Sequence, residues 1–197
     1  MLLKKGQLLI LIINAIYLIG FGFYFLSRKN YEFVMYVWVV VLLFGLIIIT
    51  NKKVNYPNSL LWLLTVWGIL HMLGGGLRIG DTVLYGKMIY TFSETYQILK
   101  FDQFVHAFGF GAATLLVWVL LKPLLKINYK KWFALSFIVV MAGLGLGALN
   151  EIIEFLAVVI MPETGVGGYI NTSLDLVSNL IGAIIAMVYI YLKKGKI

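Results

Sequence analysis

The chain has 197 residues, 62% of them hydrophobic, and its mean hydropathy is +0.98. No ordinary soluble domain has this composition, whereas a protein that crosses the membrane several times does. The absence of cysteine excludes disulfides and thiolate metal sites. The net charge of +8 comes from lysines clustered between apolar segments, a pattern typical of membrane proteins facing anionic lipid, so we expect no nucleic-acid partner.

Six apolar segments are long enough to cross a membrane. They are residues 8–26, 33–50, 59–77, 103–121, 132–160 and 173–192. Each reaches the ~18–20 residues that a helix needs to span the hydrocarbon core. The first has too long an apolar run for a signal peptide and no small-residue cleavage site before Arg28, so we interpret it as a retained helix. The sequence therefore predicts an all-α polytopic membrane protein, with one integral-membrane domain over residues 1–197.

Basic residues are distributed unevenly between the two sides of the predicted bundle. The side that holds both chain ends carries eleven lysines: Lys4, Lys5, Lys52, Lys53, Lys122, Lys126, Lys130, Lys131, Lys193, Lys194 and Lys196. The opposite side carries five basic residues: Arg28, Lys29, Arg78, Lys87 and Lys100. Because Lys and Arg concentrate in cytoplasmic loops, we expect a multi-pass inner-membrane protein with both termini in the cytoplasm.

Small and polar residues distinguish the last four segments from the first two. Residues 1–58 are nearly all apolar within their two segments, so we expect a peripheral helical hairpin facing lipid. Within residues 59–192 each segment carries a stripe at steps of three and four, which places it on one helix face. The stripes are Gly68, His71, Gly75; Asp102, His106, Gly109, Ala113; Gly143, Gly147, Glu151, Glu154; and Asp175, Asn179, Gly182, Ala186. Since small residues let helices approach closely in lipid, we predict a four-helix core that encloses the polar side chains.

The polar side chains of this core are expected at one depth, in the outer leaflet. At 1.5 Å per residue, His71 lies about 17 Å from the inner end of its helix and Glu151 roughly 28 Å along its own. His106 lies about one turn inside the outer end of its helix, and Asp175 begins the last one. The candidate site consists of His71, Asp102, His106, Asn150, Glu151, Glu154, Asp175 and Asn179.

Two histidines with several carboxylates form a ligand set suited to Zn²⁺, Mn²⁺ or Fe²⁺. The predicted metal ligands are His71, Asp102, His106 and Glu151. Asp102, four residues before His106, can alternatively orient the imidazole without binding the ion. Glu151 and Glu154, three residues apart, are similar to the carboxylate pairs of helical metal sites. No HExxH motif is present, so the sequence leaves the ion and even its presence open.

Each of these residues also has a purely structural interpretation. His71 can be an interhelical hydrogen-bond partner, and Asp102 with His106 can be a buried pair without a ligand. The stretch 172–175, Thr-Ser-Leu-Asp, fits a capping box, in which Asp175 would satisfy amides at the start of the last helix. Against these interpretations stands the cost of a charge at mid-membrane, roughly 2.5–3.5 kcal/mol on the insertion scale. Several such groups together favour a functional site.

Four stretches of the chain resemble a known family: residues 68–75, 101–106, 150–154, and 171–175 followed by Gly182 and Ala183. They are similar to the YjdF-like family of bacterial inner-membrane proteins. The spacings Asp-x3-His, Glu-x2-Glu and Asp-x6-Gly are also similar to the VanZ-like proteins, in which the position of Glu154 is often Gln. The resemblance covers about residues 60–190 and implies a small polytopic inner-membrane protein without an established reaction. The link of VanZ-like proteins to glycopeptide tolerance implies a role with envelope lipids or their carriers.

Three functions are compatible with this site. The first is recognition of a lipid or amphiphile head group in envelope homeostasis; an anionic phosphate would then need a cation, a protonated histidine or Arg78 to offset the carboxylates. The second is a metal-dependent membrane hydrolase, in which the ion activates water and a glutamate is the general base. The third is a cation- or proton-coupled transporter, although the site lies on one side and no repeat is present. Exposed small-residue faces also allow a homodimer.

Overall fold

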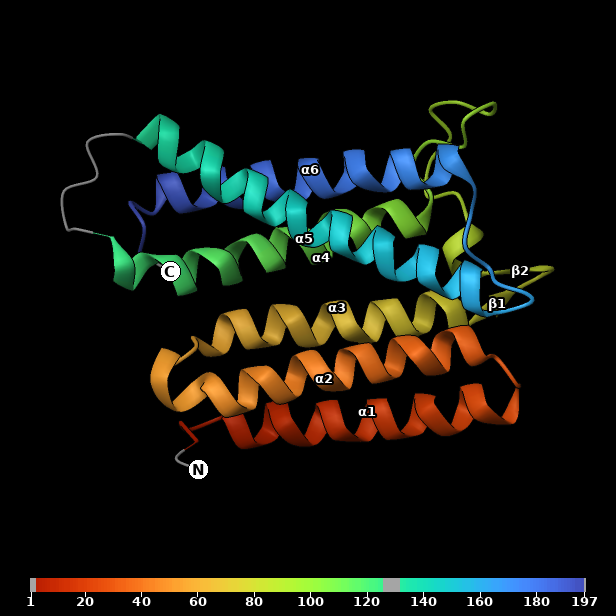
Figure 1. The fold of residues 1–197 in the computed structure, drawn as a ribbon, viewed down its shortest axis with the longest axis horizontal. Helices are drawn as coiled ribbons and strands as arrows, with labels where there is room; N and C mark the ends of the chain where they lie inside the picture. Colours follow the sequence, from red (N-terminus) through yellow and green to blue (C-terminus); the bar gives the residue numbers. More distant parts are fainter. Residues whose placement is uncertain (1–2, 126–131, 197) are drawn as a thin grey trace. The chain divides into compact units, whose positions relative to one another are not determined.

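The computed structural model describes residues 3–125 and 132–196 of the chain, so Lys126, Lys130 and Lys131 lie outside the described residues. Its long helices are α1 (Gln7–Ser27), α2 (Tyr31–Val54), α3 (Asn58–Gly76), α4 (Phe101–Leu121), α5 (Trp132–Ile160) and α6 (Tyr169–Leu192) (Figure 1). All six are long and apolar enough to cross a membrane. The predicted all-α polytopic membrane protein with six transmembrane helices is therefore confirmed.

Short elements occupy the connections between the long helices. Strands β1 (Arg78–Ile79) and β2 (Thr82–Val83) form an antiparallel hairpin, in which Arg78 pairs with Val83. Gly80 has φ +62°, a left-handed conformation that glycine adopts without a steric cost, so the chain can reverse within two residues. The 3₁₀ turns η1 (Leu84–Gly86) and η2 (Lys122–Leu124) follow β2 and α4.

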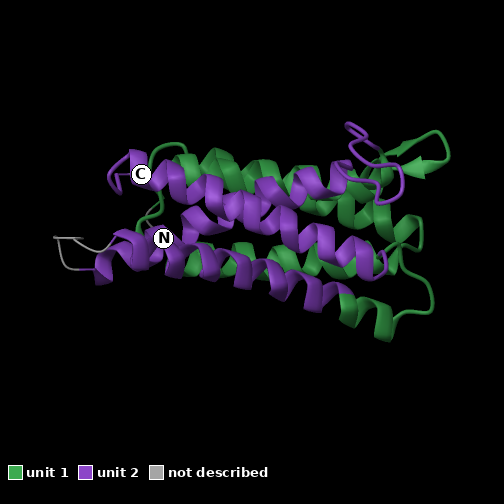
Figure 2. Cartoon of the chain, turned by 90° about the horizontal axis from the view of Figure 1, so that it is seen from above, with its two compact units in different colours: residues 1–87, 155–166 green, residues 88–154, 167–197 purple. Residues whose placement is uncertain are grey.

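The chain divides into two compact units (Figure 2). The first contains Met1–Lys87 and Phe155–Val166, and the second contains Met88–Glu154 and Gly167–Ile197. Helix α3 thus belongs to the same unit as α1 and α2. The expected division into a hairpin of residues 1–58 and a four-helix core of residues 59–192 stays a prediction.

Helix α2 shows how local sequence determines a helix of the first unit. The Asn30 side chain caps its start by accepting the backbone N–H of Phe33 at 3.1 Å, and Glu32 lies in the first turn. Lys52 and Lys53 lie in the last turn. These charges are placed as the helix macrodipole favours, negative at the N-terminus and positive at the C-terminus.

Glycines of α3 accommodate aromatic side chains within the first unit. A Cβ added at Gly68 would lie 2.2 Å from the hydroxyl of Tyr17 on α1, and one at Gly75 would lie 1.8 Å from the ring of Phe33 on α2. Both distances are far below van der Waals contact, so neither position tolerates a side chain without movement of its neighbour. The small residues of α3 therefore serve contacts with α1 and α2.

Small residues bring the helices of the second unit close together, as their spacing predicts. A Cβ at Gly182 of α6 would lie 2.0 Å from the carbonyl oxygen of Ala107 on α4. On α5, a Cβ at Gly147 would lie 2.6 Å from the Asn179 amide nitrogen of α6. The backbones of α4 and α6 thus approach closely, as helices do in lipid, where apolar burial gives no driving force, whereas beside α5 the missing side chain leaves room for Asn179. It also determines the spacing of the polar side chains that these helices carry.

Candidate functional site

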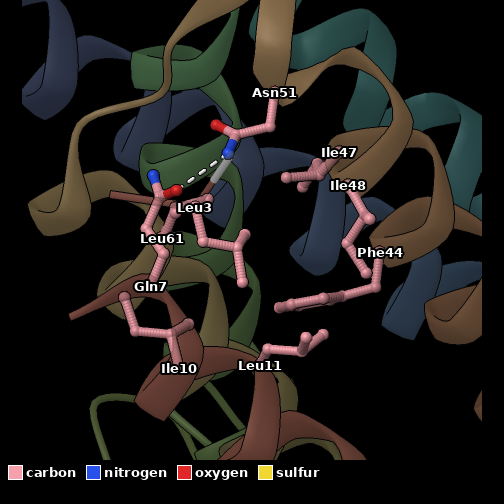
Figure 3. A pocket seen from close by; sticks show the side chains of 9 residues that line it. All are labelled: Leu3, Gln7, Ile10, Leu11, Phe44, Ile47, Ile48, Asn51 and Leu61. Carbon is pink, nitrogen blue, oxygen red and sulfur yellow. Dashed lines mark hydrogen bonds between the residues drawn. The ribbon is translucent and has the colours of Figure 1, made fainter. Parts of the chain in front are cut away.

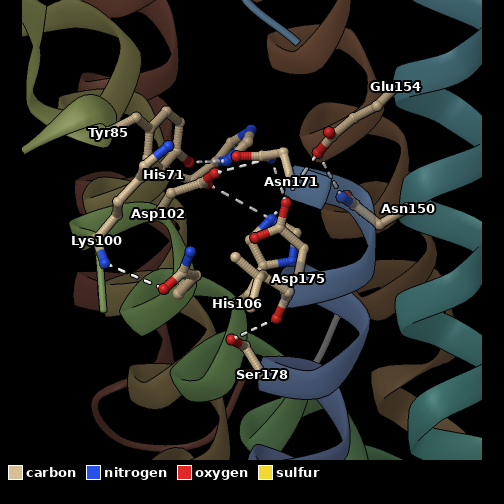
Figure 4. A network of polar contacts seen from close by, with 12 residues as sticks. His71, Tyr85, Lys100, Asp102, His106, Asn150, Glu154, Asn171, Asp175 and Ser178 are labelled. Carbon is tan, nitrogen blue, oxygen red and sulfur yellow. Dashed lines mark hydrogen bonds and ion pairs between the residues drawn. The ribbon is translucent and has the colours of Figure 1, made fainter. Parts of the chain in front are cut away.

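Three helices of the second unit bring their polar side chains together around one imidazole (Figure 4). The cluster consists of Asp102 and His106 from α4, Asn150, Glu151 and Glu154 from α5, and Asn171, Asp175 and Asn179 from α6. The start of α4 is held by Gln103, whose Oε1 accepts the backbone N–H groups of Lys100 at 3.1 Å and Leu99 at 2.5 Å. This contact positions the start of α4, where Asp102 in the first turn and His106 in the second lie on one face.

His106 is the centre of the cluster and is only 6% exposed. Its Nδ1 lies 3.0 Å from the Asn179 Oδ1 and 3.6 Å from the Glu151 Oε1. Its Nε2 lies 3.6 Å from the Asp102 Oδ1 and 3.9 Å from the Glu154 Oε1. Nδ1 thus faces the amide oxygen of Asn179, and Nε2 faces the carboxylates of Asp102 and Glu154. In the tautomer that donates from Nδ1 to Asn179, Nε2 keeps a lone pair that can bind a metal ion.

Two asparagines hold carboxylates of the cluster in place. The Asn150 side chain donates to the Glu154 Oε1 at 2.8 Å, four residues further along α5. The Asn171 Nδ2 donates to the Asp175 Oδ2 at 2.5 Å and to the Asp102 Oδ2 at 3.4 Å. The second of these bonds joins the start of α6 to the start of α4. The amides therefore orient three carboxylates without neutralising their charge.

The hydrogen-bonding capacity of the buried carboxylates is incompletely used. Both oxygens of Glu151 and the Oδ1 of Asp175 have no hydrogen-bond partner within the described part of the chain, although the two residues are 8% and 0% exposed. Among residues 3–125 and 132–196, no Lys or Arg lies within ion-pair distance of Asp102, Glu151 or Asp175. Burying charges without partners is costly, so the cluster is suited to a positively charged ligand.

The cluster contains two groups of residues whose ligand atoms lie within 4.8 Å of one another: Asp102, His106 and Asp175, and His106, Glu151 and Glu154. Bonds of about 2.0–2.2 Å in tetrahedral geometry place two ligands of one ion about 3.4 Å apart. The His106 Nε2 lies 3.6 Å from the Asp102 Oδ1 and 3.9 Å from the Glu154 Oε1, which is near that spacing and beyond a good hydrogen bond. The Nε2 side of the ring therefore has the donor spacing of a divalent cation site.

His71 belongs to the first unit, and its surroundings there are aromatic. Its ring stacks on Trp67 with centroids 5.7 Å apart, and the rings of Phe33 and Tyr36 lie 5.8 and 5.5 Å away. The Tyr85 hydroxyl hydrogen-bonds to its Nδ1. Of the predicted ligands, Asp102 and Glu151 lie beside the imidazole of His106 in the second unit. The metal-binding role of these three residues and of His71 stays a prediction.

The capping-box interpretation of Asp175 is wrong. Helix α6 begins at Tyr169, and its N-cap, Gly168, has no side chain to cap it. Asp175 therefore lies in the second turn of the helix, where Asn171 bonds to it across four residues. Sequence reasoning missed Asn171 because it was assigned to the connection before the last helix; its spacing of four residues from Asp175 was the available signal.

Comparison with known proteins places the chain in a family. The family model described as "Predicted membrane protein (DUF2238)" matches residues 7–196. No curated protein matches the chain, and no solved structure does. The match agrees with the predicted class, a membrane protein family without an assigned function, and the six candidate spans agree with a multi-pass protein. The chain belongs to the DUF2238 family of predicted membrane proteins.

Proposed function

We propose that the protein recognises the polar head group of a lipid or other amphiphile, through a divalent cation held by the cluster around His106. One observation carries the proposal: a buried imidazole is surrounded by four carboxylates, and both oxygens of Glu151 lack a hydrogen-bond partner within the described residues. A cation would neutralise the carboxylates and supply the missing ligands.

The cation also reconciles the acidic cluster with an envelope lipid. Carboxylates alone repel a phosphate or another anionic head group, whereas a divalent ion with an open coordination position attracts one. Asn179 supports this role, because an acceptor on Nδ1 leaves the lone pair of Nε2 for the metal, as partners of metal-bound histidines commonly do.

The position of the cluster along its helices supports a head group as the ligand. Asp102 is the second residue of α4, and Asp175 lies six residues, or about 9 Å, from the start of α6. Glu154 lies six residues before the end of α5. If these helices span the membrane, the cluster lies near one surface, within reach of head groups. The resemblance to VanZ-like proteins supports an envelope lipid, and the lysine distribution supports the outer leaflet of the inner membrane.

Elemental analysis of detergent-purified protein tests the cation, with His106→Ala and the exposed Glu163→Gln as a matched control. We expect about one divalent ion per chain in the wild type and in Glu163→Gln, and none in folded His106→Ala. Mass spectrometry of co-purified lipid tests the head group, and removal of the ion by a chelator should release that lipid. A folded wild-type protein without metal contradicts the cation, and lipid retention that is unchanged by chelation contradicts the head-group role.

A metal-dependent membrane hydrolase is a second candidate, favoured by the position of Glu151 beside His106. A bound ion would supply an activated water, from which Glu151 would take a proton as the water adds to an ester of the lipid; the ester bond would then break, and Glu151 would return the proton to the alcohol that leaves. Incubation with labelled lipids tests this candidate. Turnover that is lost in Glu151→Gln, while the ion stays bound, would favour a hydrolase over a protein that only binds lipid.

A further inference from the structure

A pocket in the first unit lies between the start of α1, the end of α2 and the start of α3 (Figure 3). Lys4 and Lys5 precede α1, and Lys52 and Lys53 lie in the last turn of α2. It is independent of the His106 cluster, because every residue that lines it belongs to the first unit. Its lining changes from polar to apolar along the helices. Gln7 opens α1 and Asn51 lies in the last turn of α2, while Ile10, Leu11, Phe44 and Leu61 line its interior.

The polar end of the pocket offers an unused hydrogen-bond acceptor. The Asn51 Nδ2 donates to the Gln7 Oε1 at 2.8 Å, and the Gln7 Nε2 donates to the Tyr56 carbonyl oxygen at 3.3 Å. The Asn51 Oδ1 has no hydrogen-bond partner within the described residues, although Asn51 is only 8% exposed. A buried acceptor without a donor is costly, so a ligand with a hydroxyl or amino group would satisfy it.

The rest of the pocket is suited to hydrocarbon. Apart from Gln7 and Asn51, its lining side chains are those of Leu, Ile and Phe. Phe44 precedes Asn51 by seven residues, which places it about 10 Å further into the membrane-spanning part of α2. A ligand that fills the pocket therefore has a polar end near Asn51 and an apolar end near Phe44, the order found in a membrane lipid.

Positive charge surrounds the polar end. Lys52 and Lys53 directly follow Asn51 and are exposed, as is Lys5. The Lys4 ammonium donates to the Asn55 carbonyl oxygen at 2.9 Å, which holds it at the same end. Glu32 is the only acidic residue among the first 80 and lies at the opposite end of α2. A head group with a negative charge is therefore attracted here, and nothing acidic in this stretch offsets the attraction.

We infer that an anionic phospholipid whose head group carries a hydroxyl, such as phosphatidylglycerol, lies along this pocket with one acyl chain over its open side. The phosphate lies among the lysines, the head-group hydroxyl donates to the Asn51 Oδ1, and the chain end packs against Phe44 and Leu61. The predicted topology places this lipid in the cytoplasmic leaflet. The proposed lipid site uses no metal, so its test is independent of the cation site proposed in the second unit.

Native mass spectrometry of the full chain in detergent tests the inference, with phosphatidylglycerol and phosphatidylcholine of identical acyl chains as probes. We expect phosphatidylglycerol to be retained about tenfold more strongly, and the exposed double variant Lys52→Gln/Lys53→Gln to lose that preference. Leu11→Trp, which fills the pocket, should reduce retention of both lipids, whereas its neighbour Ile12→Trp, 44% exposed, should not.

The measurement separates this lipid from other ligands. Equal retention of the two lipids by the wild type, or an unchanged preference in the double lysine variant, would overturn the inference. Equal effects of Leu11→Trp and Ile12→Trp would show that lipid binds elsewhere on the apolar surface. Addition of a chelator should leave phosphatidylglycerol bound; its release would instead assign that lipid to the cation site.

Discussion

Glu32 and Glu151 are both 8% exposed in helices that are apolar enough to span a membrane, yet their surroundings differ. Glu32, in the first turn of α2, accepts the backbone N–H of Gly165 at 2.6 Å, and the helix N-terminus favours its charge. Glu151 has no hydrogen-bond partner for either oxygen within the described residues, and other carboxylates lie nearby. Equal burial therefore accompanies a hydrogen-bonded carboxylate in the first unit and, in the second, a carboxylate for which we propose a bound cation.

The largest effect that separates the two glutamates should come from the ion itself. Adding Zn²⁺ or Mn²⁺ to chelator-stripped protein should raise the free energy of unfolding by about 2.7 kcal/mol at a concentration one hundred times Kd. His106→Ala should abolish this increase, and Glu32→Gln should retain it. Thermal melts at increasing metal concentration measure the stabilisation of each variant. An equal increase in wild type and His106→Ala would assign the ion to another place.

Neutralising each glutamate should change stability in opposite directions when metal is absent. Glu32→Gln loses a charge-assisted hydrogen bond and should destabilise the protein by about 1–3 kcal/mol. Glu151→Gln removes a like charge from a buried cluster and should stabilise the stripped protein by about 1–2 kcal/mol. Thermal melts in the presence of a chelator measure the sign of the stability change in each variant. The same sign for both variants would remove the distinction drawn between the two units.

Asn179 should affect the ion through the imidazole. Asn179→Ala removes the acceptor from His106 Nδ1 and should weaken metal binding about tenfold, as loss of such partners commonly does. Asn179→Asp keeps an acceptor and should bind the metal nearly as well as wild type. Isothermal titration of stripped protein compares the two, and equal weakening would indicate that Asn179 only fills space.

Two glycines on α5 provide the smallest test. Gly147→Ala places a methyl group where the Asn179 amide nitrogen lies 2.6 Å away and should weaken metal binding a few-fold by displacing that side chain. A Cβ at Gly145 meets nothing within 4 Å, so Gly145→Ala should leave binding unchanged and stabilise the helix by about 0.5–1 kcal/mol. Metal titration measures the affinity of each variant, and thermal melts measure its stability. Equal metal affinity in Gly147→Ala and Gly145→Ala would show that the packing of Asn179 against Gly147 does not affect the ion.

Features confined to one segment were predictable from the sequence. Apolar length predicted the six helices, and spacings of three and four placed Asp102 beside His106 and Glu151 beside Glu154. Contacts between segments could not be predicted in the same way. Periodicity shows which face of a helix is small or polar, but not which residues of another helix pack against that face. Tyr17 and Phe33, which fill the space beside the glycines of α3, were therefore not identified.

The capping-box prediction for Asp175 was wrong because it also depends on structure outside the motif. A Thr-Ser-Leu-Asp stretch fits a capping box, but whether it caps depends on where the preceding residues turn helical. Residues from Tyr169 onward already form α6, so Asp175 and Asn171 become neighbours on one helix face. The pairing of His106 with Asn179, 73 residues away, depends on how α4 and α6 pack.

The hydrogen bonds of Asn171 have a consequence for ion selectivity. Its amide nitrogen carries two hydrogens, and they engage the Oδ2 atoms of Asp102 and Asp175. Each Oδ2 already accepts one hydrogen bond, so the Oδ1 atoms are the oxygens of these aspartates most available to a proposed ion. Ca²⁺ requires six to eight oxygen ligands and often bidentate carboxylates. If the proposed cation site exists, monodentate aspartates and an imidazole would disfavour Ca²⁺ and favour ions of low coordination number such as Zn²⁺.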